Sequence, residues 1–290
     1  MTGGYVPAAR FRHSLIAGLS VLLSAEVEAQ DKSQYTLFNP TPAGQMRPFN
    51  TDRPTKSNVP YTVDAGHLQY EGDLFIYGFN NTATPDTDVT TWTIVNPTFK
   101  LGLLNNLDFE VNISANNTIQ STTRSTNTST WSNGVGDTFT RFKVNLFGND
   151  GGPAAMALIP YGKWPTAPVG VGNGYVEAGI IAPLAVSLPL GFTSILTGEF
   201  DYKKNPNDGG YHGEFPLLLN INRPIVEGLT GYAEIYADWS SNHDVPDIYT
   251  LDFALAWSPF PNFQLDTGIN IGLVPAAPAY QIYAGISQRF

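Results

Sequence analysis

Hydrophobic and polar residues alternate along much of the chain with a period of two. In the last segment, 278–290, Tyr280, Ile282 and Phe290 fall on one side, while Gln281 and Arg289 fall on the other. Because successive side chains of a β-strand point to opposite faces, this pattern predicts a strand with one apolar face. Soluble sandwiches and membrane barrels both contain such strands, so this segment alone favours neither.

The alternation recurs at regular spacing and predicts about twelve strands, a count good to about two. Most are about ten to fourteen residues long, near the roughly ten that a tilted strand needs to cross a bilayer. The expected spans are 65–78, 90–104, 107–116, 134–147, 153–164, 175–188, 192–204, 211–223, 229–240, 248–258, 262–273 and 279–290.

Short and long connections alternate along the chain. Asn105-Asn106 is a short turn, whereas Asn80 to Val89, the Ser/Thr/Asn-rich Asn116 to Asn133, and Lys204 to Gly210 are longer and polar. Outer-membrane barrels have short periplasmic turns and longer external loops, and an even strand number puts Phe290 on the periplasmic side. We therefore predict an all-β fold, a transmembrane antiparallel up-and-down β-barrel.

The N-terminus is typical of a secretory signal peptide cut after Ala29. Arg10, Arg12 and His13 precede an apolar run from Leu15 to Ala25. That run is about eleven residues long, well short of the roughly twenty of a membrane-spanning helix. The predicted organisation is a signal peptide (1–29), an N-terminal segment (30–64) and an outer-membrane barrel (65–290).

Export and a barrel together predict a location in the cell outer membrane. The expected partners are outer-membrane lipid, a small-molecule solute, and the barrel-assembly machinery, which would bind the closing strand that ends at Phe290. The net charge of −10 argues against nucleic acid, because phosphate binding needs a basic face. We expect a monomer or a weak oligomer.

Residues 30–64 do not alternate and are rich in Pro, Asn and Thr. Two interpretations are open. The segment enters the barrel as a plug, with Asp52 and Arg53 pairing to opposite charges on the wall, or it is a loose periplasmic leader. The first matters because barrels of roughly eight to twelve strands have lumens partly filled by side chains.

Composition agrees with a barrel. Charged residues make up 14% of the chain and aromatic residues 12%, while the mean hydropathy is close to neutral. A barrel hides its apolar content in every second residue, so its average stays unremarkable. The absence of cysteine excludes a disulfide framework and thiolate metal sites, and we expect no metal and no cofactor.

Alternation also assigns charged side chains to the barrel interior. Either these charges pair across a wet lumen and hold its shape, or they form a selective lining for a small solute. Acids outnumber bases, which favours cations or neutral polar solutes over anions. The candidate solute path is lined by Glu71, Asp73, Lys100, Glu110, Asp137, Arg141, Lys143, Lys163, Glu199, Asp201, His212, Glu214, Glu234, Asp252 and Asp266.

Aromatic residues fall into two groups. Apolar cargo would need an inner apolar pocket, whereas aromatic residues near strand ends are typical of interfacial girdles. The inner candidates are Tyr77, Phe139, Tyr161, Tyr232, Tyr236 and Tyr283. The girdle candidates are Trp92, Trp164, Trp239 and Trp257.

An enzyme in the same fold, such as a lipid hydrolase, is the main alternative. It would need a Ser and a His within hydrogen-bond reach at the lipid boundary. After signal removal His67, His212 and His243 remain; the first two are expected to point inward and the third to lie in a loop. No Gly-x-Ser-x-Gly or His-Glu-x-x-His motif occurs, so we expect no catalysis.

Several linked motifs resemble the outer-membrane transporter family named after the meta-pathway of phenol degradation. They are Asp52-Arg53-Pro54, Val63 to Glu71, Gly136-Asp137 followed by Arg141 and Lys143, Gly148 to Gly152, and Gly210 to Phe215. The resemblance covers roughly residues 50–290 and implies a bacterial outer-membrane barrel acting as a transporter. It carries over no catalytic or ligand residues, and the family's name is not evidence for phenol. Thr55 stands where the family often has an acid, which weakens any acid-dependent role of the segment.

The predicted function is passive passage of small solutes, aromatic or other low-polarity compounds among them, through an outer-membrane channel. The alternatives are a barrel enzyme and a closed structural barrel.

Overall fold

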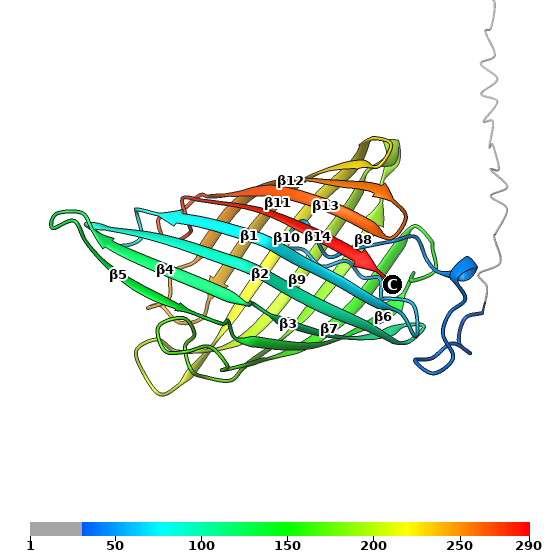
Figure 1. Ribbon diagram of the computed structural model, residues 1–290, viewed down its shortest axis with the longest axis horizontal. Coiled ribbons are helices and arrows are strands. Elements are labelled where there is room, and N and C mark those ends of the chain that lie inside the picture. Colours follow the sequence, from blue (N-terminus) through cyan, green and yellow to red (C-terminus); the bar gives the residue numbers. More distant parts are fainter. Residues whose placement is uncertain (1–30) are drawn as a thin grey trace, which may run out of the picture. The chain divides into compact units, whose positions relative to one another are not determined.

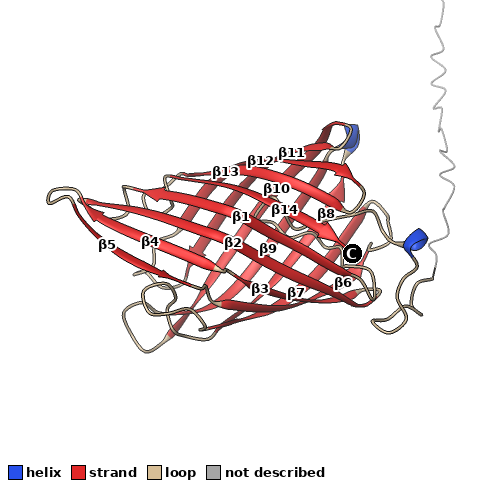
Figure 2. Ribbon diagram, viewed as in Figure 1, coloured by secondary structure: helices blue, strands red, loops and turns tan. Residues whose placement is uncertain are grey.

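The computed structural model describes residues 31–290, so the predicted signal peptide lies outside the described residues. In this part of the chain fourteen strands form one antiparallel sheet (Figures 1 and 2). The strands are β1 (Leu68–Asn80), β2 (Thr87–Leu104), β3 (Leu107–Ile113), β4 (Asn116–Thr123), β5 (Thr128–Gly134), β6 (Thr138–Phe147), β7 (Ala154–Trp164), β8 (Glu177–Ser187), β9 (Thr193–Lys204), β10 (Tyr211–Val226), β11 (Leu229–Ser240), β12 (Ile248–Phe260), β13 (Phe263–Gly272) and β14 (Tyr280–Arg289). Two 3-10 turns, η1 (Ala43–Gln45) and η2 (Pro189–Gly191), complete the elements. No helix within 31–290 is both long enough and apolar enough to cross a bilayer.

The sheet closes on itself because β1 pairs with β14 on one side and with β2 on the other. Gln69 of β1 lies opposite Arg289 of β14 and opposite Lys100 of β2. The closed barrel has twelve strands, which are β1 to β3 and β6 to β14. The predicted all-β, antiparallel, twelve-strand barrel is confirmed.

The connections sort to the two ends of the barrel. Short turns such as 105–106, 188–192 and 261–262 lie at the end where the chain reaches Phe290, which we call the turn end. The longer connections, including 165–176 and 205–210, lie at the opposite end, the hairpin end, together with the tip of β4 and β5 (Figure 1).

The expectation of a polar loop over Asn116 to Asn133 was wrong, because this stretch forms the hairpin β4–β5. β4 continues along the edge of β2 beyond the end of β3, with Thr123 opposite Thr87. The first half of β2 needs partners for its backbone N–H and C=O groups. The stretch is polar but rich in β-branched Thr, which suits a pleated strand.

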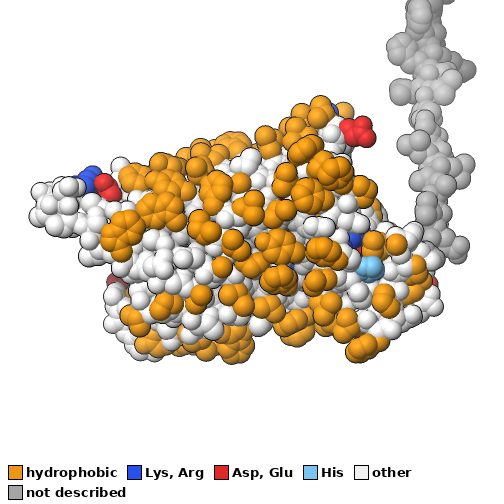
Figure 3. Space-filling view, in the orientation of Figure 1, with side chains coloured by type: hydrophobic (Ala, Val, Ile, Leu, Met, Phe, Trp, Pro, Cys, Tyr) orange, Lys and Arg blue, Asp and Glu red, His pale blue; other side chains and the backbone are white. Residues whose placement is uncertain are grey.

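The outer surface of the barrel carries an apolar band. Figure 3 shows hydrophobic side chains across the wall, and charged ones near the two ends. In β14 the outward Ile282 is 39% exposed and the inward Tyr283 only 6%, as the alternation predicts. A closed sheet with an apolar outside satisfies every ladder group in hydrocarbon.

A charge placed in this band should destabilise the barrel. Leu219 of β10 is exposed on the wall, so we expect Leu219→Arg to lower the free energy of unfolding by about 2–4 kcal/mol in a bilayer. Thr130→Arg, at an exposed position of the β4–β5 hairpin, is the control and should change it little. Urea unfolding in lipid vesicles measures both, and equal effects would contradict a lipid-facing β10.

The assignment of Tyr77 to the lumen was wrong. Leu74 and Phe75 are consecutive yet both exposed, because a β-bulge shifts the register between β1 and β14 here. A bulge adds one residue and reverses which side chains face outward. Tyr77 therefore lies outside, in contact with the rings of Trp92 and Tyr280.

Candidate functional site

The barrel interior is polar and largely filled. Most of the charged residues predicted to line the lumen are buried, and Asp137, Arg141 and Glu199 are half-buried at the edges of cavities. The alternation thus placed these side chains on the inward face. Their partners come in large part from residues 47–64, which precede β1 and which we call the inner segment.

Asp52 of the inner segment forms ion pairs with two lysines on the wall. Its carboxylate lies 2.8 Å from Lys143 Nζ on β6 and also pairs with Lys100 on β2. Lys100 Nζ lies 2.6 Å from Glu71, and Lys143 Nζ lies 3.4 Å from Glu110. All four wall side chains are buried. Three carboxylates and two lysines thus meet away from solvent, where a buried ion needs a partner of opposite charge.

Arg53 extends to a different part of the wall. Its guanidinium lies 2.5 Å from Asp266 on β13 and also pairs with Asp73 on β1. Gly285 of β14 makes room for it, since a Cβ there would lie 2.1 Å from Arg53 Nη2. Adjacent residues of the inner segment therefore bind wall charges of opposite sign.

Lys56 adds a third attachment, which the sequence analysis missed. Its ammonium lies 2.8 Å from Asp252 on β12. The backbone N–H groups of Lys56 and Ser57 donate to Glu234 on β11 at 3.0 and 3.2 Å. No local pattern marks Lys56, because its partners become neighbours only when the barrel closes.

At the turn end the inner segment is held by a second cluster. Arg47 Nε donates to Asp150 at 3.0 Å, and Lys32 Nζ pairs with the same carboxylate at 2.8 Å. Asp64, fully buried, pairs with Arg289 at 3.0 Å. Burial alone would raise the pKa of Asp150, but hydrogen bonds from Lys32, Asn105 and Arg47 lower it. Because its pKa is lowered in the folded state, ionised Asp150 stabilises the fold above the ordinary pKa range of a carboxyl group. This stabilisation is lost as the pH falls through the lowered pKa.

Three cavities follow one another along the lumen. The hairpin-end cavity, of about 600 Å³, reaches the loop residues Pro206 and Val245. It shares Arg141 and Glu199 with a middle cavity of about 230 Å³. The middle cavity shares Asp52, Arg53 and Thr55 with a turn-end cavity of about 340 Å³. The middle and turn-end cavities therefore both border the inner segment.

An apolar patch covers part of the inner wall, and it was not among the predicted lumen residues. Several inward residues of β7 to β10 are small or aliphatic and buried, whereas most of the other inward residues are polar or charged. They are Ala155, Ala157, Ile159, Ile181, Ala185, Ile195 and Leu218. The signal was present, because 154–160 is apolar on both faces and not on one alone.

The inward aromatic residues other than Tyr77 lie where alternation put them. Phe139, Tyr161 and Tyr236 line the hairpin-end cavity, and Tyr232 lines the turn-end cavity. Tyr283 is buried beneath the Arg53 guanidinium, 5.8 Å from the ring centre. Tyr161 donates a hydrogen bond to Asp201 across β8.

His67 and His212 have partners other than serine. His67 contacts the carbonyl oxygens of Phe290 and Thr41, at 2.9 and 2.8 Å. His212 contacts Asn205 at 2.8 Å and Glu214 at 3.1 Å. In the described part of the chain, no group of three or more His, Cys, Asp or Glu side chains is arranged to hold a metal ion.

A closed twelve-strand sheet with an apolar outside and a charged inside is the fold of an outer-membrane β-barrel. Residues 51–290 match the sequence family described as "Putative MetA-pathway of phenol degradation", and the chain belongs to this family. The expected resemblance is therefore confirmed.

One solved channel structure supports the fold. The COG4313 outer membrane channel from Pseudomonas putida F1 superposes with a TM-score of 0.60 at 12% identity, over 77% of this chain and 95% of that one. The NanC porin gives a TM-score of 0.45 at 10% identity, over 76% and 98%. None of the curated proteins compared with the chain matches it significantly.

Proposed function

We propose that the protein is an outer-membrane channel through which small solutes pass passively around the inner segment. The observation that carries this proposal is the series of three cavities, each sharing lining residues with the next, from one end of the barrel to the other. A solute entering at the hairpin end would pass Arg141 and Glu199, and then the backbone at Thr55. The inner segment acts as a constriction plug in this scheme.

The solved channel named above supports the proposal only through its shared fold. The chemistry of the lumen supports it further, because polar and charged side chains facing a water-filled path are what channels use for selection. We propose a passive role without catalysis, since the two buried or rim histidines contact backbone, amide and carboxylate groups.

The lumen also changes the expected charge preference. The predicted preference for cations counted the acids of the wall alone. Arg53 pairs with Asp73 and Asp266, and Lys56 pairs with Asp252. Because these acids are already neutralised, the side chains without partners decide what the path selects.

Planar-bilayer recording of the purified mature protein tests the proposal. We expect discrete conductance steps in salt, together with uptake of small neutral sugars into liposomes that contain the protein. A protein that inserts yet gives neither conductance nor uptake would show a closed structural barrel. Release of fatty acid from phospholipid by the same sample, lost in His212→Ala, would favour the hydrolase instead.

A further inference from the structure

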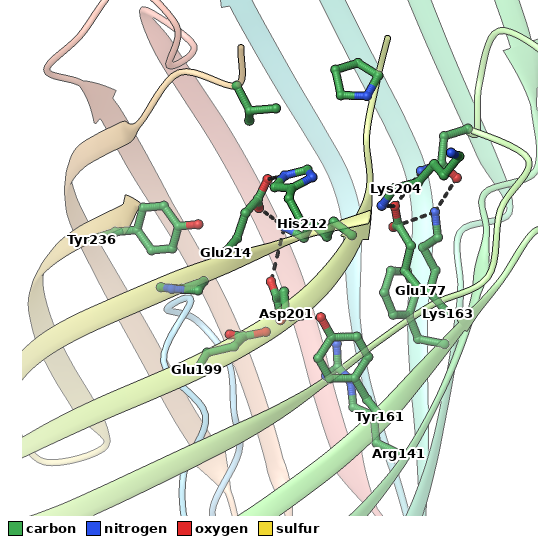
Figure 4. A pocket seen from close by; sticks show the side chains of 16 residues that line it. Arg141, Tyr161, Lys163, Glu177, Glu199, Asp201, Lys204, His212, Glu214 and Tyr236 are labelled. Atoms are coloured by element: carbon green, nitrogen blue, oxygen red, sulfur yellow. Dashed lines mark hydrogen bonds and ion pairs between the residues drawn. The ribbon is translucent and has the colours of Figure 1, made fainter. Parts of the chain in front are cut away.

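The junction between the hairpin-end and middle cavities carries one cation and one acid without a close partner of opposite charge. Arg141 of β6 and Glu199 of β9 both line both cavities. Within residues 31–290 neither side chain lies within 3.5 Å of an oppositely charged group, and the neighbour of Glu199 in hydrogen-bond reach is another carboxyl, that of Asp201. Figure 4 draws no contact from either side chain. The carboxylate oxygen found near Arg141 is that of Glu110, 4.0 Å from Nη1.

The lysines of the hairpin-end cavity all have acceptors. Lys163 lies 2.8 Å from Glu177 (Figure 4), and Lys203 lies 2.5 Å from Glu214. Lys204 donates to the backbone carbonyl oxygens of Asp208 and Gly210. A half-buried charge without a close partner is costly, so the Arg141 guanidinium favours an anionic ligand group. Arg141 Nε is buried and has no acceptor.

An aromatic surface lies between the two charges. Phe139 lies beneath the Arg141 guanidinium, 5.9 Å from its ring centre. Tyr161, paired with Arg141 across β6 and β7, is fixed by its hydrogen bond to Asp201 (Figure 4). Gly179 of β8 leaves room for that ring, because a Cβ there would lie 2.5 Å from Tyr161 Cε1. A flat apolar group can therefore rest on a preformed surface.

The spacing sets the size of the ligand. β6 and β9 are separated by β7 and β8, so their backbones lie about 14 Å apart at an interstrand distance of about 4.8 Å. Both side chains point inward from a curved wall, which leaves a gap suited to a short ligand. An α-amino acid has its carboxylate and ammonium on one carbon, and it would neutralise both side chains at once.

We propose that Arg141, Glu199 and the Tyr161 ring form a binding site for small zwitterions, with aromatic α-amino acids as the best-fitting class. Arg141 binds the carboxylate, Glu199 binds the ammonium group, and the ring carries the apolar body. Any role of this site in transport rests on the proposed channel function. Binding to the site is measured separately, without transport.

Isothermal titration calorimetry of the mature protein in detergent tests the site with three matched probes. They are phenylalanine, 3-phenylpropionate, which lacks the ammonium group, and 2-phenylethylamine, which lacks the carboxylate. We expect phenylalanine to bind more tightly than either by about tenfold or more, since a charge-assisted hydrogen bond adds about 1.5–3 kcal/mol.

Two variants separate the two charges. Arg141→Gln should weaken phenylalanine and 3-phenylpropionate about tenfold or more and leave 2-phenylethylamine unchanged. Glu199→Gln should weaken phenylalanine and 2-phenylethylamine by a similar factor and leave 3-phenylpropionate no weaker. Arg124→Gln and Asp88→Asn remove a pair with a 3.6 Å separation between an exposed arginine at the β4–β5 tip and a half-buried aspartate of β2, and should change nothing.

Three results would overturn the site. They are no measurable phenylalanine binding, equal binding of all three probes, and unchanged phenylalanine binding in either variant with wild-type circular dichroism. Conductance is recorded on the same samples. A protein that conducts but does not bind would refute the zwitterion site alone, whereas one that binds but does not conduct would refute the channel alone.

Discussion

The double variant Asp52→Ala/Arg53→Ala should conduct several-fold more than the wild-type protein. It removes the ion pairs from the inner segment to Lys100, Lys143, Asp73 and Asp266 while leaving the net charge unchanged. Breaking one buried pair typically costs about 3–5 kcal/mol, so the segment loses its main attachment. The barrel should stay folded, because its ladder hydrogen bonds are untouched and Lys100 keeps Glu71.

Two measurements check this expectation. Planar-bilayer recording gives the size of the conductance steps, and limited trypsin digestion reports whether the chain after Lys56 becomes accessible. Asp88→Ala/Arg124→Ala is the matched control, since it removes a pair of opposite charges near the β4–β5 tip, away from the inner segment. Unchanged conductance together with continued protection of Lys56 would mean that other contacts hold the inner segment in place.

Gly102→Ala should displace the inner segment where it leaves the lumen to enter β1. An added Cβ would lie 2.0 Å from the carbonyl oxygen of Asp64 and 2.8 Å from that of Val63. The obstacle is backbone, which cannot rotate away as a side chain would. The site is also fixed by hydrogen bonds, since the Gly102 N–H donates to His67 O at 3.0 Å and its carbonyl accepts from Gly66 at 2.9 Å.

We expect Gly102→Ala to lower the free energy of unfolding by about 1–3 kcal/mol, the usual range for overpacking. It should also raise conductance through loss of the docked segment. Gly198→Ala on β9 is the control, because nothing lies within 4 Å of its added Cβ. Urea unfolding and bilayer recording follow both variants. Equal stability and equal conductance of the two would rule out close packing at Gly102 as a requirement for docking.

Alternation predicted which side chains face inward, because a strand has only two faces and a closed barrel has one wet side. It failed at Tyr77, where the bulge at Leu74 reversed the phase. The polar composition of Asn116 to Asn133 also predicted a loop, although strand formation there depends on pairing with β2. Both errors have the same cause: the register and the pairing depend on contacts with neighbouring strands, and these contacts cannot be predicted from the local sequence.

The sequence by itself determined the closed barrel. Period-two segments of bilayer length, with short and long connections in turn, leave few other ways to bury one apolar face and satisfy the backbone. The closing strand, β14, and the inward position of the lumen charges follow from the same pattern.

Only the tertiary structure decided which charges meet. Asp52 reaches Lys100 and Lys143 across 48 and 91 residues of chain, and Arg53 reaches Asp266 across 213. Such pairs depend on barrel closure and on the path of a segment without any periodicity. For the same reason, the lack of a close oppositely charged partner at Arg141 and Glu199 emerges only from the folded lumen, where the nearby lysines have acceptors.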